Sequence, residues 1–468
     1  MDALDLARWQ FGITTVYHFL FVPLTIGLSF LVAGMQTVWV RTGNPSYLRL
    51  TKFFGELFLI NFALGIVTGI VQEFQFGMNW SSYSRFVGDI FGAPLAIEGL
   101  LAFFLESTFL GLWIFGWDRL PKKVHLATIW IAAIGTVLSA YFILAANAWM
   151  QYPVGYTFNE AAGRAELVDF GAVLTSQLTI ITFFHTIVAA LMTAGAFVAG
   201  VSLWRIARRP DADVAAFRSA GRIGAVSVLV AAVLVFVTGD LQARVMTNVQ
   251  PMKMAAAEAL YETSKPASFS IFTIGSLDGT EELFSIRIPN VLSFLATGTL
   301  DGEVVGINNL QAEYEGTYGP GDYRPIIPIT YWTFRIMIGL GALGALAAAW
   351  MLWALRRGSV RPNRWVVAVA VLLPLLPLFA NSIGWIFTEM GRQPWIVFGL
   401  MGTAAGVSPG TSAFEVGLTL VVFTLLYGGL AVVEVGLLLR RIRAGLPPAP
   451  APSEAAGDEP ERPAAFGY

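Results

Sequence analysis

Long apolar stretches alternate with shorter polar segments along almost the whole of this 468-residue chain. A helix needs roughly 20 consecutive apolar residues to cross the hydrocarbon core of a bilayer, and nine stretches meet that length. We therefore predict an all-α fold, a polytopic membrane helix bundle with nine transmembrane helices. The predicted spans lie near residues 12–40, 53–74, 93–117, 124–147, 178–204, 219–240, 327–355, 365–388 and 413–439.

The polar segments divide the chain into four parts. Residues 1–240 hold the first six spans and residues 327–445 the last three, with a long polar loop at 241–326 between them. Such a loop is either a functional lid or binding segment, or a variable surface excursion, and its length favours neither. Residues 446–468 are rich in Pro, Ala and Glu, which is typical of a disordered tail. We find no internal repeat along the chain.

Basic residues are shared unevenly between the two sets of connecting segments. Lys and Arg close to the ends of spans stay in the cytoplasm, so the basic set indicates the cytoplasmic side. This puts the N-terminus and the loop 241–326 outside and the C-terminus in the cytoplasm. The basic set contains Arg41, Arg49, Lys52, Arg119, Lys122, Lys123, Arg205, Arg208, Arg209, Arg218, Arg222, Arg356, Arg357, Arg361, Arg364, Arg440, Arg441 and Arg443; the short segments of the other set contain Arg8, Arg85, Arg164 and Arg392.

Composition excludes several kinds of chemistry. Only 13% of the residues are charged and 56% are hydrophobic, and the net charge of −2 gives no basis for nucleic-acid binding. The chain has no Cys, which excludes disulfides, iron–sulfur clusters, thiolate zinc sites and covalently attached c-type haem. Three His are too few for a copper site of several imidazoles. The first residues carry acids and no small-residue cleavage site, so we expect no removable signal peptide.

A few ionisable or ligand-type side chains lie inside the apolar stretches, where such residues are expensive and functional. Most fall at one depth, in the outer third of five predicted spans. Imidazoles, a thioether and carboxylates without Cys suit haem iron better than zinc or a hard cation. Taken singly, each His is equally explained as a hydrogen-bonded core residue and the Met as a packing residue. The set is His18, Glu98, His185, Arg335, Met337, Glu389 and Arg392.

Two acids in the third span and one further His need separate interpretation. Glu98 and Glu106 are eight residues apart, so we expect them on nearly one helical face, about 12 Å apart along the axis. Carboxylates in this arrangement are typical of a proton relay, and hydrogen bonding between helices is the alternative. His125 follows two Lys at the cytoplasmic start of the fourth span, and we interpret it as an interfacial residue rather than a ligand.

Several motifs, in order from the first residues through the eighth span, resemble those of subunit I of the cytochrome bd quinol oxidases. The resemblance implies a haem-bearing subunit of a quinol:oxygen oxidoreductase in a bacterial cell membrane. Such an enzyme oxidises quinol at the outer face, reduces oxygen to water with cytoplasmic protons, and builds a proton gradient without pumping. The motifs are RWQFG (8–12), YHFLFVPLT (17–25), FQFGMNW (74–80), GDIFGAPLAIEGLLAFFLESTFLGLW (88–113), NAWMQYPVG (147–155), YWTFRIMIGLG (331–341) and TEMGRQPW (388–395).

The resemblance also implies three haems, namely b558, b595 and d, the last possibly replaced by a haem b. It makes His185 and Met337 the axial ligands of the haem b558 iron. It makes His18 and Glu389 ligands of the two high-spin haems, with Glu98 beside them. We favour His18 for haem d and Glu389 for haem b595, and the reverse assignment stays open. Positions near the haems are matched by Arg8, Arg335, Trp385 and Arg392.

Further positions match the routes of protons and quinol. Glu106 and Ser139 resemble a proton path from the cytoplasm toward Glu98. In QPMKMAAAEALYET (250–263), Lys253 and Glu258 match a quinol-binding loop of the short type. The resemblance implies oxygen, menaquinol or ubiquinol, a second membrane subunit, and leaves room for small single-span subunits. The alternative from another class is a channel or transporter whose polar cluster binds an ion or substrate, which would be colourless when purified.

Overall fold

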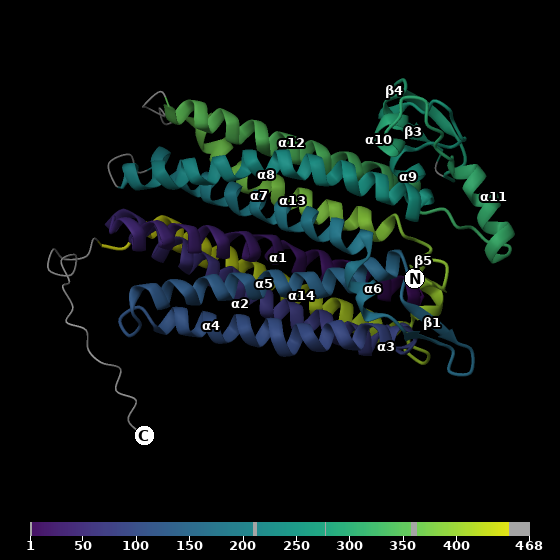
Figure 1. The fold of residues 1–468 in the computed structure, drawn as a ribbon, viewed down its shortest axis with the longest axis horizontal. Coiled ribbons are helices and arrows are strands. Elements are labelled where there is room, and N and C mark those ends of the chain that lie inside the picture. The colour runs from purple at the N-terminus through teal and green to yellow at the C-terminus, as the bar shows by residue number, and fades with distance from the viewer. Residues whose placement is uncertain (1, 209–212, 277, 357–362, 449–468) are drawn as a thin grey trace.

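The fold is a bundle of long helices that lie side by side along the longest axis of the molecule (Figure 1). This computed structural model describes residues 2–208, 213–276, 278–356 and 363–448. Within them, nine helices are long and apolar enough to cross a membrane, which confirms the predicted number of spans. They are α1 (Ala3–Thr42), α2 (Pro45–Met78), α3 (Ser81–Ile97) continued by η1 (Glu98–Phe103) and α4 (Phe104–Phe115), α5 (Lys122–Gln151), α7 (Gln177–Arg208), α8 (Val214–Val249), α12 (Ile327–Arg356), α13 (Arg364–Met390) and α14 (Ala413–Ala444).

Most of these helices extend beyond the apolar stretches that predicted them. Helix α1 already begins at Ala3, where the carboxylate of Asp2 caps it by accepting the backbone N–H of Asp5. Helix α8 continues to Val249, so the first residues of the predicted loop 241–326 are helical. The apolar pattern marks only the part of a helix that faces lipid or the core, whereas backbone hydrogen bonding continues into the polar ends.

The connections at one end of the bundle carry most of the short elements. The segment between α8 and α12, here called the loop lobe (residues 250–326), lies at the same end as the N-terminus, opposite the end where the described chain finishes (Figure 1). Three two-stranded antiparallel sheets lie in these connections. The lobe contains α9 (Pro251–Glu258), β3 (Phe269–Gly275), β4 (Glu282–Ile288), α10 (Val291–Thr297) and α11 (Ile307–Tyr318); the other connections contain β1 (Tyr156–Asn159), β2 (Arg164–Leu167), α6 (Phe170–Thr175), β5 (Trp395–Val397), β6 (Met401–Gly402) and η2 (Thr403–Gly406).

The opposite end holds the predicted basic connections. Of the residues assigned to them, Arg209, Arg357 and Arg361 lie outside the described residues, as do residues 449–468 of the predicted tail. Arg49 of this end forms a two-pronged ion pair with Asp213, with N–O distances of 2.8 and 3.0 Å. The pair joins the start of α2 to the start of α8.

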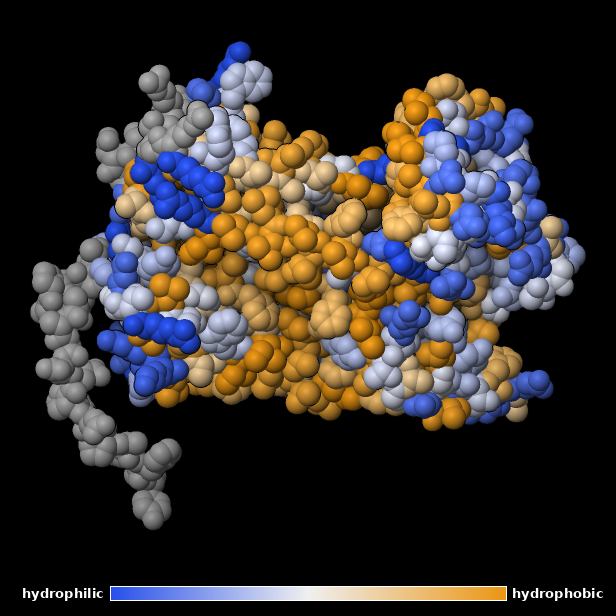
Figure 2. Space-filling model, turned by 45° about the horizontal axis from the view of Figure 1, so that its top comes forward, coloured by the Kyte–Doolittle hydropathy of each residue, from blue (hydrophilic) through white to orange (hydrophobic). Residues whose placement is uncertain are grey.

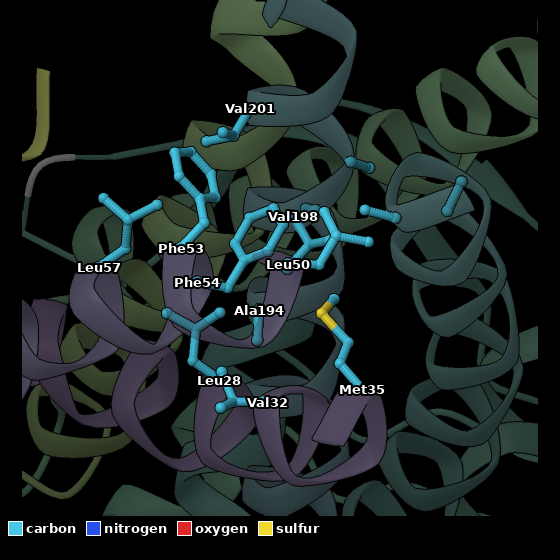
Figure 3. Close-up of a cluster of buried hydrophobic side chains, with 14 of the residues drawn as sticks. Leu28, Val32, Met35, Leu50, Phe53, Phe54, Leu57, Ala194, Val198 and Val201 are labelled. Atoms are coloured by element: carbon cyan, nitrogen blue, oxygen red, sulfur yellow. The ribbon is translucent and has the colours of Figure 1, made fainter. Parts of the chain in front are cut away.

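An apolar core fills the half of the bundle next to these basic connections. Apolar side chains of α1, α2 and α7 meet there (Figure 3). Because lipid is as apolar as a side chain, this core is stabilised by close packing rather than by removal from water. The residues labelled in Figure 3 are Leu28, Val32, Met35, Leu50, Phe53, Phe54, Leu57, Ala194, Val198 and Val201.

Helices α7 and α8 approach each other through a pair of glycines. A Cβ atom added at Gly224 would lie 2.5 Å from the carbonyl oxygen of Gly195, and one added at Gly195 would lie 2.8 Å from that of Gly224. Small residues at a helix crossing let two backbones come close and gain dispersion contacts that lipid cannot replace. The crossing therefore requires the absence of side chains at both positions.

We expect Gly224→Ala to destabilise the folded protein by about 1–3 kcal/mol, because the new methyl group would overlap backbone that cannot rotate away. The measurement is the thermal midpoint of the detergent-solubilised protein followed by size-exclusion chromatography. Gly436→Ala on α14 is the control, since a Cβ there meets nothing within 4 Å. Equal midpoints for the two variants would contradict the packing argument.

Candidate functional site

The half of the bundle next to the loop lobe contains two histidines held in the same way. His18 of α1 bonds through Nδ1 to the hydroxyl of Thr68 on α2 at 2.9 Å, and His185 of α7 bonds through Nδ1 to that of Thr238 on α8 at 3.0 Å. Each threonine hydroxyl donates its own proton to the carbonyl four residues earlier in its helix. It must then accept from Nδ1–H, which leaves the lone pair on Nε2. This is the tautomer that a metal-binding imidazole needs.

A glycine follows each threonine and makes room for the imidazole. A Cβ atom would lie 3.1 Å from His18 Cε1 at Gly69, and 3.4 Å from His185 Cε1 at Gly239. The two segments read VTGIVQ (67–72) and VTGDLQ (237–242). The two segments that hold the histidines therefore share a short motif, which is a local similarity and not a repeat of a whole structural unit. The signal was a shared motif in the span that follows each histidine span.

Met337 is connected to the surroundings of His18 by a series of contacts. Its Sδ occupies the space left by Gly384 of α13, where a Cβ would lie 2.6 Å away. The next residue, Trp385, stacks on Phe19 with ring centroids 4.9 Å apart, and Phe19 follows His18 in α1. The indole Nε1 of Trp385 is buried and has no hydrogen-bond partner among the residues that the structure describes. An aromatic pair therefore lies between the two predicted ligands.

A buried ion pair links the loop lobe to α12. Arg335 Nη2 lies 2.7 Å from Glu258 Oε2, and its guanidinium carbon lies 4.7–5.2 Å from the ring centroids of Phe269, Tyr331 and Phe334. Burial raises the pKa of Glu258, and Arg335 opposes that rise. Nε and Nη1 of Arg335 are buried without a partner in the described chain. Since buried donors are almost always satisfied, they fit the carboxylate of a bound group.

A chain of hydrogen bonds runs from the lobe to the end of α13. Lys253 Nζ donates to Gln151 Oε1 at 2.6 Å, and Gln151 Nε2 donates to Asn147 Oδ1 at 2.7 Å. Asn147 Nδ2 donates to Glu389 Oε1 at 2.9 Å, and the other oxygen of Glu389 pairs with Arg392. The two amides are one turn apart on α5. Asn147 and Gln151 thus connect Lys253, predicted to bind quinol, to Glu389, predicted to bind haem. The motif that contains the two amides did not reveal this role.

Lys253 and Glu258 do not line an open cleft. They are 3% and 2% exposed, and the cavity beside Lys253 has a volume of about 10 Å³, enough for about one water molecule. Burial, together with the nearby charge of Arg392, lowers the pKa of Lys253 to about 7, while Glu389 opposes this shift. The lysine therefore exists in both protonation states near neutral pH.

Arg8 and Arg392 both make contacts near the end of α13. Arg392 is 5% exposed, pairs with Glu389 and donates to the carbonyl oxygen of Ile396. Its Nε has no hydrogen-bond partner within the described ranges. Arg8 Nη2 donates to Gln393 Oε1 at 3.3 Å. Two cations thus lie in the half of the bundle next to the loop lobe, here called the polar half. One of them, Arg392, has an Nε donor without an acceptor among the described residues.

Glu98, Ser139 and Glu106 lie where α5 packs against the third span. Ser139 Oγ donates to Glu98 Oε1 at 2.5 Å. Glu106 is 7% exposed and packs on Gly135, where an added Cβ would lie 3.0 Å from the Glu106 Cβ. A π-helical segment, Glu98–Phe103, separates the two acids.

This π segment brings the two acids closer to a common face than a regular α-helix would. In an α-helix, residues eight apart diverge by about 80°. A π turn takes up about one extra residue, so the divergence falls to about 20°. The predicted common face is therefore supported by a local irregularity that the spacing argument did not include, and such segments are frequent at functional sites.

His125 lies in the first turn of α5, at the basic end of the bundle where it was predicted. Its side chain is 2% exposed, with Nδ1 2.9 Å from Gln36 Nε2 and Nε2 2.8 Å from the carbonyl oxygen of Trp113. Both ring nitrogens are used, so it has no lone pair for a metal. The prediction also passed over Glu434 of α14, an acid within the ninth span that interacts electrostatically with Tyr17.

The residues of the polar half fit haem. A porphyrin supplies four ligands to iron, so the protein needs to supply only one or two. The available groups are imidazoles with a free Nε2, a thioether, a carboxylate and arginine donors without acceptors. No group of three or more His, Asp or Glu that could hold a bare metal ion occurs among the described residues.

Comparisons with known proteins agree with these features. The chain matches the family model of cytochrome bd terminal oxidase subunit I over residues 6–446. It is 48% identical to the cytochrome bd ubiquinol oxidase subunit 1 of Bacillus subtilis (strain 168) over 446 residues, 95% of this chain and 94% of that protein. It is 38% identical to the cytochrome bd-II ubiquinol oxidase subunit 1 of Escherichia coli (strain K12) over 501 residues, 95% of this chain and 97% of that protein.

The fold also resembles a solved structure. The bd oxidase from Geobacillus thermodenitrificans matches with a TM-score of 0.85 and 29% identity, covering 95% of this chain and 99% of that one. The chain belongs to the cytochrome bd terminal oxidase subunit I family. It is therefore a multi-pass membrane subunit of a bacterial respiratory oxidase, and its family implies bound haem and at least one other subunit.

We expect Lys253→Met to change how stability depends on pH. Between about pH 7 and 10.5, the unfolded chain binds a proton that folded Lys253 does not. The stability of the parent therefore falls as pH is lowered through this window, by up to about 1.4 kcal/mol per pH unit. The variant lacks this loss, so its thermal midpoint relative to the parent should rise as pH is lowered. The control is Lys265→Met, at an exposed lysine of the same lobe, whose thermal midpoint should vary with pH as that of the parent does. If the midpoint of Lys253→Met also varied with pH as the parent's does, the shifted pKa would be refuted.

Proposed function

We propose that this chain is the haem-bearing subunit of a quinol:oxygen oxidoreductase, which oxidises quinol at the outer face and reduces oxygen to water with cytoplasmic protons. The observation that supports this most is the pair of partly buried histidines whose Nδ1 atoms are held by threonine, which leaves Nε2 free at both. When bound, the haems transfer electrons and hold the oxygen that is reduced. The curated relatives from Bacillus subtilis and Escherichia coli are named as ubiquinol oxidases; menaquinol and ubiquinol both remain candidate substrates here.

The proposed ligands follow from the side chains that the polar half offers. His185 and Met337 would hold the iron of haem b558, a low-spin haem that takes two protein ligands. His18 serves haem d, or a haem b in its place, and Glu389 serves haem b595; the reverse assignment is the alternative. The unsatisfied donors of Arg335 and Arg392, with Arg8 nearby, pair with haem propionates. Trp385 occupies the space between sites, and Glu98 lies beside the high-spin pair.

The proposed proton route climbs from the cytoplasmic end of the third span. Glu106 receives protons from that side, and Glu98 with its hydrogen-bonded Ser139 passes them toward the high-spin sites. The common face produced by the π segment supports this order. Because protons are consumed from the cytoplasm and released outside, charge separates across the membrane without pumping. The basic connections support the sidedness, with the loop lobe outside.

The loop lobe is the proposed quinol-binding element, of the short type. Lys253 and Glu258 are buried, so we infer that they respond to quinol through their charges and hydrogen-bond chains. One chain ends on Glu389 and the other on Arg335. Both therefore connect the lobe to residues assigned to haem. The subunit acts with a second membrane subunit, and small single-span subunits are compatible with its broad apolar surface (Figure 2).

The first test is the absorption spectrum of the purified complex and of two variants at the low-spin site. His185→Ala should remove the low-spin haem b bands and keep the high-spin bands. Thr238→Val should keep the haem but change its redox midpoint, because the imidazole loses the acceptor of its Nδ1 proton. A colourless parent would favour a channel or transporter, and an unchanged spectrum in His185→Ala would reject the ligand assignment.

The second test concerns the proton route. Glu106→Gln keeps the shape of the side chain but cannot carry a proton at neutral pH. We expect oxygen-driven proton uptake and quinol oxidase turnover to fall by about 10²-fold or more, with unchanged haem content. Glu313→Gln on the exposed side of α11 is the control and should behave like the parent. Normal proton uptake in Glu106→Gln would exclude it from the path.

A further inference from the structure

The hairpin of β3 and β4 has one face fastened to the rest of the protein. Arg287 donates to the carbonyl oxygens of Glu258 and Ala259 at the end of α9, at 3.3 and 2.6 Å. Ser270 shares a hydrogen bond of 2.8 Å with the hydroxyl of Tyr331 on α12. The polar side chains of the hairpin therefore point toward α9 and α12 and fix its orientation.

The other face of the hairpin is apolar and exposed. The strands are antiparallel, with Ile274 opposite Phe284 and Phe272 opposite Ile286. A contiguous exposed patch of large apolar side chains marks a surface that contacts a partner or a membrane. The apolar hairpin face consists of Ile274, Phe284, Ile286 and Ile288, which are 48%, 53%, 51% and 42% exposed; Ile271 and Leu283, at the two irregularities of the strand register, are also exposed, at 51% and 62%.

This face continues into the exposed apolar surface of α12, a helix long and apolar enough to cross a membrane. The ring of Phe272 contacts that of Trp332 edge-on, with centroids 5.4 Å apart. Ile329, Trp332 and Ile336 of α12 are themselves 38%, 38% and 43% exposed. Tryptophan is enriched where the hydrocarbon core meets the headgroups. Trp332, near the lobe end of α12, therefore marks the depth at which the hairpin begins.

The placement of the hairpin agrees with this continuity. Figure 1 shows β3, β4 and α10 beside the lobe end of α12, out to the flank of the bundle rather than only above its end. In Figure 2 the lobe rises beside the broad apolar belt of the helices, and apolar atoms line the margin of the lobe that faces the belt. The apolar hairpin face thus overhangs the region that lipid occupies.

We propose that the apolar hairpin face inserts into the boundary between headgroups and acyl chains of the leaflet at the lobe end, as a membrane-surface anchor. The occupant is lipid, because the face is continuous with the exposed apolar surface of a helix that is long and apolar enough to span a membrane, and joins it at a tryptophan, a residue enriched at the membrane interface. Apolar side chains that enter this boundary are stabilised in proportion to the area they bury. The anchor holds the lobe, and with it α9, at a fixed height over the membrane.

The absence of cysteine from the chain makes a direct test available. A nitroxide label is attached to Phe284→Cys or Ile286→Cys in the complete complex, reconstituted in phosphatidylcholine liposomes. Power-saturation EPR then compares the access of oxygen, which concentrates in lipid, with that of a water-soluble nickel chelate. We expect oxygen access to exceed nickel access several-fold at both positions. Labelled complex without the new cysteine gives the background, and haem absorbance per protein reports assembly.

Ala312→Cys on the exposed face of α11 is the matched control in the same lobe and should favour the nickel chelate. Nickel access at Phe284→Cys equal to that at Ala312→Cys would place the hairpin in water and overturn the proposal. A label that is immobile and closed to both reagents would mean that a protein partner covers the face, which also overturns it.

Discussion

A polar side chain inside a bilayer has to find its hydrogen-bond partners within the protein, since lipid offers none. This constraint decides how the functional half of the bundle is built. Each imidazole is held by a threonine on the neighbouring helix, and the threonine in turn uses a carbonyl of its own helix. Several buried donors stay unsatisfied among the described residues, and those on Arg335, Trp385 and Arg392 lie beside the predicted ligands, where a bound group would satisfy them.

The two halves of the bundle have different roles: one is packed through apolar side chains and the other carries the polar residues of the candidate site. Next to the basic connections, α1, α2 and α7 pack through apolar side chains and close glycine contacts, and this half supplies rigidity. Next to the loop lobe, the same helices carry the histidines, and α5 brings Ser139, Asn147 and Gln151 to the acids and to Lys253. A helix that is firmly packed at one end can hold a polar side chain precisely oriented at the other.

The sequence predicts much of this arrangement and misses particular parts for physical reasons. The lengths of the apolar stretches predict nine spans correctly, because a helix that crosses lipid can contain few polar residues. The prediction missed the helical ends at Ala3 and Val249, because the parts of a helix that lie in water need no continuous run of apolar residues. The π segment is invisible to a spacing argument that assumes a uniform turn. Burial of Lys253 and His125 depends on contacts distant in sequence, which hydrophobicity along the chain cannot reveal.

The repeated Val-Thr-Gly segment has a consequence for how two sites in one subunit differ. With the imidazole at each held by the same hydroxyl and seated against the same glycine, the electron donation from the histidine side is nearly matched. If both bind iron as proposed, a gap between their reduction potentials would come from what differs between the sites: the type of haem, the thioether that Met337 offers to one of them, and the charge nearby. The protein would then set the direction of electron flow by varying one side of each site while it keeps the other constant.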